Sequence, residues 1–586
     1  MRLTGLDWAI ILAYFALSAG IGLAFAKRAG KSMSEFFVSG RALPWWLAGT
    51  SMVATTFGAD TPLAVTGMVA SNGVAGNWLW WNMVMSGILT VFFYAHLWRR
   101  AEVLTDVEFA EIRYSGRSAA LLRVFRALYL AGPINLIIMA WVNLAIVTVL
   151  DVALGIPPVW GLLFMFGLTL LYSTLSGLWG VVVTDLFQFT LAMVGSIVLA
   201  ILSVRAVGGI DGMLARLPEH FGSAEAALAI LPAANAEWMP ATAFLAYLAV
   251  QWWATSYPGS EPGGGGYGAQ RLVSAKTERD GMLATLWFNI AHFAIRPWPW
   301  ILTALAVVIL YPNLENPADG YVRAVVEILP PGLTGLMLAA FAAAYMSTIG
   351  THLNWGASYL VNDVYVRFLK PDASEKQTVR ASRLSTLLLF VLSLPVTYWL
   401  HVQGSIETAW RILIALGAGA GLVYILRWYW WRINAWSELG AMGVSLLTFV
   451  LLELFDVFDA SDPLEGAQMM LTITAVSTIG WLAVTFMTRP TDTDKLHSFY
   501  RRVRPGGPGW RRVRQEMGIA DEPIADGALS WVNWVAGVVS VYATLFGVGR
   551  VVFGDLLIGF AWIALAAMSF TVIGVNLGRK DARATS

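Results

Sequence analysis

The sequence predicts an all-α polytopic membrane protein, and three observations carry this prediction. Of its 586 residues, 58% are apolar and only 13% are charged, whereas soluble domains carry roughly 25% charged residues. Many apolar segments reach the roughly 20 residues that a helix needs to cross a bilayer. Lysine and arginine are concentrated in alternate connections between these segments, which is typical of cytoplasmic loops.

About fifteen apolar segments are expected to cross the membrane. Placing the N-terminus outside and the C-terminus inside puts 31 of the 38 basic residues in inside connections. The outside connection 456–462 carries three aspartates and no basic residue. The expected spans are residues 6–26, 45–70, 77–98, 122–150, 157–173, 177–203, 241–258, 282–310, 332–365, 383–400, 406–427, 436–455, 466–487, 528–548 and 555–577.

The composition also limits the partners of this chain. It contains no cysteine, which excludes disulfides, thiolate metal sites and cysteine nucleophiles. The net charge of +1 predicts no nucleic-acid partner. The expected partners are membrane lipid and a small-molecule solute. The chain is expected to function as a monomer in the plasma (inner) membrane.

The second span contains a polar interruption that a plain membrane helix would not tolerate. Pro62 lacks an amide hydrogen and Gly58 weakens helix. Asp60 costs about 2.5–3.5 kcal/mol at the centre of a bilayer on insertion scales. Non-helical backbone at this depth is tolerated only where it is buried or lines a cavity. The segment is therefore either a packed proline kink or part of a binding site.

The seventh span ends in a similar interruption. Residues 258–266 contain two prolines and five glycines, and no Gly-Lys-Ser/Thr follows, so this is not a phosphate-binding loop. Either the span is unwound near its middle or it ends at a glycine-rich cytoplasmic hinge. Spans 2–6 and 7–11 would form a 5+5 inverted repeat, because each repeat has an odd number of crossings. Broken helices at matching positions, here spans 2 and 7, are typical of secondary transporters.

The ninth span carries hydroxyl side chains in its middle. Ser347 and Thr351 are four residues apart and therefore share a helix face, with Thr348 beside them. Small residues on a membrane helix often serve close packing. Hydroxyl and carbonyl oxygens are also the ligands that hard cations prefer, so a Na⁺ site is the alternative.

Several motifs in order resemble those of the sodium:solute symporter family, which has the inverted-repeat fold of the leucine transporter. The resemblance covers roughly residues 6–430. The motifs are Leu104-Thr-Asp-Val-Glu-Phe109 with Arg113-Tyr-Ser115, the stretch Ser176–Gln188, Gln270-Arg271 with Ser274-Ala-Lys276, and Ala342–Asn354 with Asn362-Asp-Val-Tyr365.

The resemblance implies a main sodium site between spans 2 and 9. Its ligands are the backbone carbonyls of Ala54, Phe57 and Ala344 and the hydroxyls of Ser347 and Thr348. Na⁺ is then the coupling ion, and no organic cofactor is expected.

Some members of the family hold a second sodium ion nearer the cytoplasm. The resemblance implies Asp185 and Thr351 for that position, but Gly350 stands where a further hydroxyl is expected. The alternative role of Asp185 is a structural hydrogen bond, so the stoichiometry stays open.

A solute pocket is expected between the two interruptions. Arg296 must find a carboxylate or water, and we expect it to reach Asp60 in at least one conformation. Arg411 lies four residues after Glu407 and is expected to form a local ion pair with it. The candidate pocket residues are Asp60, Thr61, Trp253, Tyr257, Glu261 and Arg296.

The predicted domain organisation follows from these features. The large basic loop is expected to lie in the cytoplasm near anionic lipid. The segments are an N-terminal extra helix (1–44), the first repeat (45–203), an outer loop (204–240), the second repeat (241–432) and C-terminal extra helices (433–586) that include the basic loop 488–527.

The sequence thus predicts a Na⁺-coupled secondary symporter that imports a small polar organic solute by alternating access. Thr61 stands where the sugar transporters of the family have histidine or glutamine, so a sugar carrier is not expected. A membrane sensor acting through a separate signalling partner is the alternative. An enzyme is not expected, because neither His-Glu-x-x-His nor Gly-x-Ser-x-Gly occurs.

Overall fold

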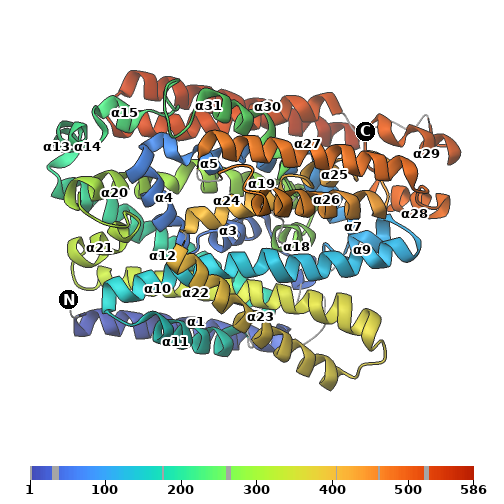
Figure 1. The fold of residues 1–586 in the computed structure, drawn as a ribbon, viewed down its shortest axis with the longest axis horizontal. Coiled ribbons are helices and arrows are strands. Elements are labelled where there is room, and N and C mark those ends of the chain that lie inside the picture. The colour runs from blue at the N-terminus through green and yellow to red at the C-terminus, as the bar shows by residue number, and fades with distance from the viewer. Residues whose placement is uncertain are drawn as a thin grey trace.

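The computed structural model describes residues 3–29, 38–103, 105–173, 177–258, 266–403, 405–459, 462–520 and 527–585. These residues are helical apart from turns, loops and one isolated β-bridge between Leu43 and Ala275. The helices run along the long axis of the molecule and pack side by side (Figure 1). Ten of the described helical segments are long and apolar enough to cross a membrane, so the chain is an all-α integral membrane protein.

The first half of the chain holds the helices of the predicted first repeat and the outer loop. Three short helices, α13, α14 and α15, fold the segment that was expected to be an outer loop. The elements are α1 (Gly5–Ala29), η1 (Ser39–Arg41), α3 (Trp45–Thr55), α4 (Asp60–Asn72), η2 (Val74–Asn77), α5 (Trp78–Trp81), α6 (Val84–Leu89), η3 (Thr90–Tyr94), α7 (Ala95–Ala101), α8 (Phe109–Arg113), α9 (Gly116–Tyr129), η4 (Leu130–Ile134), α10 (Asn135–Leu154), α11 (Pro158–Ser173), α12 (Gly177–Ala206), α13 (Gly209–Arg216), α14 (Pro218–Phe221) and α15 (Ala224–Leu228).

The next part of the chain holds the helices of the predicted second repeat. Within α24, Arg411 lies 2.8 Å from Glu407, which confirms the expected local ion pair. The elements are α16 (Ala241–Ala246), η5 (Tyr247–Gln251), α17 (Trp252–Ala254), α18 (Tyr267–Ser274), α19 (Glu278–Ile290), η6 (Ala291–Ile295), α20 (Pro297–Leu310), α21 (Asp319–Ile328), α22 (Leu333–Ser358), η7 (Tyr359–Leu369), α23 (Glu375–Gln403), α24 (Ile406–Gly417) and α25 (Gly421–Leu426).

The C-terminal helices complete the bundle. Helices α30 and α31 lie along one edge of Figure 1, and α1, α11 and α23 lie along the opposite edge. The basic loop folds into α28, η8 and α29 at one end of the molecule. The elements are α26 (Ala435–Leu454), α27 (Pro463–Met487), α28 (Thr493–Val503), η8 (Pro508–Trp510), α29 (Arg511–Glu516), α30 (Gly527–Val552) and α31 (Leu556–Thr585).

Helices cover each of the fifteen predicted spans at least in part. The number that cross the membrane stays a prediction, because only ten described segments have the length and hydropathy of a continuous span. The segment from α3 to α4 falls outside that set because helix stops at Thr55 and restarts at Asp60. Pro62 lies in the first turn of α4, where a missing amide hydrogen breaks no helical bond.

The seventh span also lacks a continuous long helix. Its last helical turn ends at Ala254, and Thr255 to Pro258 follow as non-helical backbone. The glycine-rich residues 259–265 lie outside the described residues, so the choice between an unwound span and a hinge stays open.

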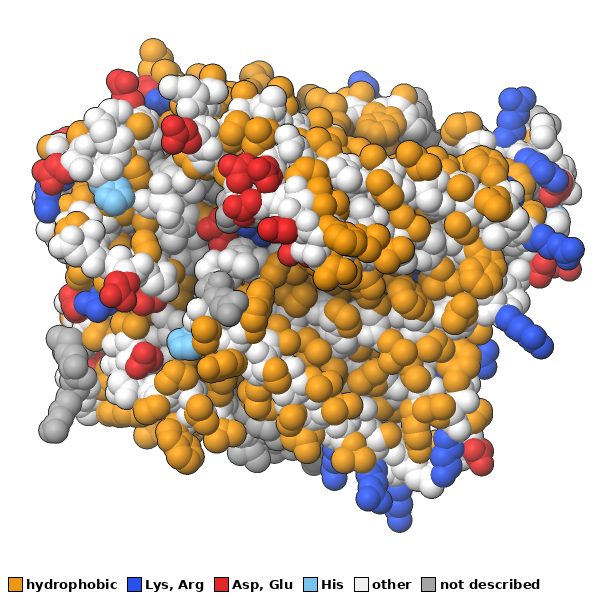
Figure 2. All heavy atoms as spheres, viewed as in Figure 1, with side chains coloured by type: hydrophobic (Ala, Val, Ile, Leu, Met, Phe, Trp, Pro, Cys, Tyr) orange, Lys and Arg blue, Asp and Glu red, His pale blue; other side chains and the backbone are white. Residues whose placement is uncertain are grey.

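Charged side chains gather unevenly on the two ends of the molecule. Figure 2 shows exposed Lys and Arg side chains concentrated at the end where Figure 1 places α28 and α29. The opposite end, where α13, α14 and α21 lie, carries acidic and basic side chains together. The label of the N-terminus lies at that opposite end.

A buried charge network joins the C-terminal helices to the rest of the bundle. Here it denotes Asp106, Arg126, Tyr257, Arg427 and Glu438. Arg126 lies 3.1 Å from Asp106 and 3.6 Å from Glu438, and Arg427 lies 3.1 Å from Glu438. The Tyr257 hydroxyl donates to Asp106 at 2.7 Å. Buried charges of this kind are tolerated because each is paired and hydrogen-bonded.

We expect Glu438→Gln to lower the free energy of unfolding by about 3–5 kcal/mol, because two buried guanidinium groups lose their shared counter-charge. The check is thermal unfolding of the detergent-purified protein. Glu453→Gln is the matched control, since this glutamate lies on the same helix but is exposed. Equal melting temperatures for the two variants would contradict the structural role of the network.

Candidate functional site

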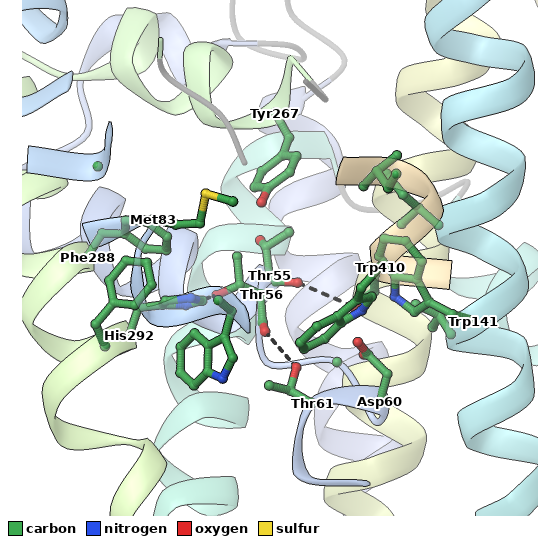
Figure 3. Close-up of a pocket in the computed structure, with 18 of the residues that line it drawn as sticks. Thr55, Thr56, Asp60, Thr61, Met83, Trp141, Tyr267, Phe288, His292 and Trp410 are labelled. Carbon is green, nitrogen blue, oxygen red and sulfur yellow. Dashed lines mark hydrogen bonds between the residues drawn. The ribbon is translucent and has the colours of Figure 1, made fainter. Parts of the chain in front are cut away.

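A cavity lies at the interruption between α3 and α4. It encloses about 160 Å³ in which the centre of a water molecule fits. Segments from both halves of the chain enclose it (Figure 3). Its lining residues are Thr55, Thr56, Gly58, Asp60, Thr61, Leu79, Trp80, Met83, Ser86, Gly87, Ile138, Trp141, Val142, Tyr267, Phe288, His292, Phe293, Arg296, Thr348, His352, Trp410, Leu413 and Ile414.

A side chain and a backbone amide donate hydrogen bonds to carbonyl groups at the interruption. The Thr61 hydroxyl donates to the Thr56 carbonyl at 3.2 Å, across the gap between the two helices. The Phe57 amide donates to the Ala54 carbonyl at 3.0 Å. Backbone groups inside a membrane protein require such partners, and these bonds hold the interruption in a defined shape.

Arg296 reaches this interruption from the segment between η6 and α20. Its Nη1 donates to the Val53 carbonyl at 3.3 Å and to the Thr56 hydroxyl at 3.0 Å. The guanidinium also lies over the ring of Trp300, 5.2 Å from its centroid. Both Arg296 and Asp60 are described, and no ion pair within 4.0 Å joins them in this conformation. Arg296 therefore contacts the end of α3 directly, and it acts on Asp60 only through longer-range electrostatics.

His292 shares the wall of the cavity with Arg296. Its Nδ1 is 3.0 Å from the Thr56 hydroxyl, and its ring packs against Trp80. His292 was not among the site residues predicted from the sequence. Its position four residues before Arg296 places both on one helix face, and this spacing was the available signal.

Asp60 begins α4 and lines the opposite part of the cavity together with Thr61. Its side chain is 5% exposed. The Trp141 indole is a hydrogen-bond partner of the Asp60 carboxylate, and Trp410 lines the same cavity (Figure 3). These two rings have centroids 6.5 Å apart and an interplanar angle of 72°. The cavity thus combines a buried carboxylate with aromatic walls.

Ser347 and Asp185 contact each other directly. The Ser347 hydroxyl donates to Asp185 Oδ1 at 2.8 Å, and the Ser51 hydroxyl donates to Asp185 Oδ2 at 2.6 Å. One carboxylate on α12 thereby joins α3 and α22. Ser51 was not selected from the sequence, since a serine in an apolar helix carries no distinguishing signal.

The other residues expected to bind sodium lie around this contact. The Thr348 hydroxyl donates to the Thr55 carbonyl at 3.4 Å. Ala54, Phe57 and Ala344 are buried. Thr351 is half-buried one turn further along α22. Asp185 and Thr351 are both described, and no hydrogen bond joins them.

Two further pocket candidates, Tyr257 and Trp253, do not line the cavity. Tyr257 is buried in the charge network and accepts a hydrogen bond from Arg126 at 2.6 Å. The Trp253 indole nitrogen donates to the Ala249 carbonyl at 2.6 Å on its own helix. Glu261 lies outside the described residues.

Known proteins resemble this chain over most of its length. A sodium/glucose cotransporter of Vibrio parahaemolyticus is 26% identical over 419 residues, covering 67% of this chain and 74% of that protein. A sodium/mannose cotransporter of Bos taurus is 24% identical over 499 residues, covering 77% and 80%.

A solved structure supports the same fold. A Na⁺-coupled sialic acid symporter, in a substrate-bound outward-open state, superposes with a TM-score of 0.64 at 20% identity and covers 84% of this chain and 99% of that one. The family model of the sodium:solute symporters matches residues 36–447. These relatives are transporters and not enzymes, and they support Na⁺-coupled symport. The chain belongs to the sodium:solute symporter family.

Proposed function

We propose that this protein imports a small polar organic solute, driven by Na⁺, through alternating access. The observation that carries the proposal is the cavity at the α3–α4 interruption, which borders the hydroxyl face of α22 at Thr348. An ion site and a solute site that share one interruption can be coupled, because movement of α3 relative to α22 changes both. Each ligand then strengthens the other if both favour the same conformation.

In the proposed main sodium site, the carbonyls of Ala54, Phe57 and Ala344 and the hydroxyls of Ser347 and Thr348 coordinate the ion. The Thr348–Thr55 contact supports this arrangement, because it brings the oxygen atoms of α22 and of the end of α3 together. Hydroxyl and carbonyl oxygens suit a hard cation. Asp185 supplies negative charge next to the site through its bond to Ser347.

For the second sodium position we propose Asp185 and Thr351, with a competing structural role for Asp185. Both carboxylate oxygens of Asp185 accept from serines in this conformation, which supports the structural role. The expected ratio is therefore one Na⁺ per solute unless these bonds open.

We propose that the basic end of the molecule faces the cytoplasm and that the N-terminus lies outside. The concentration of Lys and Arg side chains at the α28–α29 end supports this orientation (Figure 2). Spans 2–6 and 7–11 form the proposed inverted repeats, with interruptions in spans 2 and 7. The membrane potential then adds about 2.3 kcal/mol per Na⁺ for each 100 mV.

Uptake by proteoliposomes tests the function as a whole. Purified protein, acting as a monomer, should accumulate a labelled solute from a panel of sugars, amino acids, amines and carboxylates only under an inward Na⁺ gradient. Replacing Na⁺ with K⁺ should abolish uptake. A sensor that works through a signalling partner would bind a solute without accumulating it.

Ser347→Ala and Thr348→Ala each remove one oxygen atom of the proposed sodium cage. Each variant should raise the Na⁺ concentration for half-maximal uptake about tenfold, the equivalent of a ligand contributing about 1.4 kcal/mol. Ser358→Ala, near the end of the same helix, is the matched control and should leave the Na⁺ dependence unchanged. Unchanged Na⁺ dependence in both site variants, with normal expression, would refute the site.

Asp185→Asn separates the two roles of this carboxylate. If Asp185 only holds Ser51 and Ser347, the Hill coefficient for Na⁺ should be one in the parent and in the variant. If it binds a second ion, the coefficient should exceed one in the parent and fall to one in the variant. Parallel measurement of charge flux and solute flux gives the stoichiometry independently.

A further inference from the structure

Asp60 is a buried carboxylate at the cavity that forms no direct ion pair with a described side chain. Its side chain is only 5% exposed, and it lines the cavity. Within the described part of the chain, no Lys, Arg or His nitrogen lies within 4.0 Å of its carboxylate. A buried carboxylate is costly unless a cation or hydrogen-bond donors compensate it. Asp60 has hydrogen-bond donors in Trp141 and in backbone amides, and Arg296 acts on it at longer range. No described cationic side chain contacts it directly, and the cavity in front of Asp60 has room for a cation from the solute.

Arg296 is held away from this role by its own contacts. It donates to the Val53 carbonyl and to the Thr56 hydroxyl, and its guanidinium lies over Trp300. These contacts fix it to the end of α3. A cationic group of the solute would therefore meet Asp60 without first displacing Arg296.

The walls next to Asp60 also favour a cation. Trp141 contacts the carboxylate, and Trp410 packs nearly edge to face against Trp141 in the cavity wall (Figure 3). An indole face attracts a positive charge through its quadrupole, and the attraction is larger in a desolvated site.

We propose that the solute carries a cationic nitrogen, which Asp60 binds between the indoles of Trp141 and Trp410. This inference rests on the proposed symport function and names the substrate class of the same cavity. A neutral polyol would donate hydrogen bonds to the carboxylate but would bring no counter-charge, so in this proposal Asp60 makes the cavity selective for organic cations, including amines.

Two pairs of probes of similar size test this proposal in the full-length protein. The first pair is choline and its uncharged carbon isostere 3,3-dimethyl-1-butanol, and the second is ethanolamine and ethylene glycol. Binding is measured in Na⁺ buffer by calorimetry and by tryptophan fluorescence. At least one cation should bind about tenfold or more tightly than its neutral partner. If neither cation exceeds its neutral partner, the proposal is overturned.

Two variants then assign the effect to the site. Asp60→Asn should remove the advantage of the cation, whereas Asp151→Asn, at an exposed aspartate of α10, should preserve it. Trp410→Leu should lower the ratio of the cation's affinity to that of its neutral partner, which covers the case in which Asp60→Asn does not fold. A cation advantage that survives in both Asp60→Asn and Trp410→Leu overturns the assignment.

Direct binding of radioactive Na⁺ separates this inference from the function on which it rests. If Na⁺ binds to the parent protein and Ser347→Ala weakens that binding, while the organic cations bind no more tightly than their neutral partners, the amine inference fails and the proposed symport function stands. If Na⁺ does not bind to the parent protein, both fail.

Discussion

The interrupted helix between Thr55 and Asp60 is the constraint on which the rest of the site depends. Carbonyl groups released inside a membrane protein need donors, and no lipid supplies them. Here the donors come from the chain itself, from Thr61 across the gap and from Arg296 on a distant segment. Because Arg296 must reach the end of α3, the segment from η6 to α20 is drawn against the interruption. The cavity is the space that this arrangement encloses.

Asp185 links α3 to α22 beside this interruption. Its two oxygen atoms accept from Ser51 on α3 and from Ser347 on α22, so the distance between these helices depends on one carboxylate. A cation bound near Ser347 would change that hydrogen bond and, with it, the position of α3. Since α3 ends at the cavity, an ion at the proposed site beside Ser347 and a solute in the cavity would both act on α3. This is a physical route for coupling that needs no long chain of contacts.

Local sequence patterns predicted much of this arrangement, but they did not predict its contacts between residues far apart in the chain. The interruption at Gly58–Pro62 and the hydroxyl residues of α22 were visible because composition alone conflicts with a plain membrane helix. Tyr257 was expected in the pocket because it lies near the second interruption, yet it binds Asp106, 151 residues away. Trp141 and Trp410 were not predicted as site residues, because the chain has 28 tryptophans and nothing in the sequence distinguishes these two. Side chains at these positions acquire their roles only from packing.

The charges of the site bear on what the cavity selects. Sodium and an organic cation would together bring two positive charges into a region of low dielectric, where uncompensated charge is costly. The region offers one carboxylate near each proposed position: Asp185 beside Ser347, and Asp60 at the cavity. Arg296 donates to oxygen atoms of α3 and lies near enough to Asp60 to act on it electrostatically. A neutral sugar would meet these groups through hydrogen bonds alone and would balance none of their charge. Similarity to sugar cotransporters therefore supports the scaffold and the coupling ion, and under the proposal made above the side chains around Asp60 would select the solute.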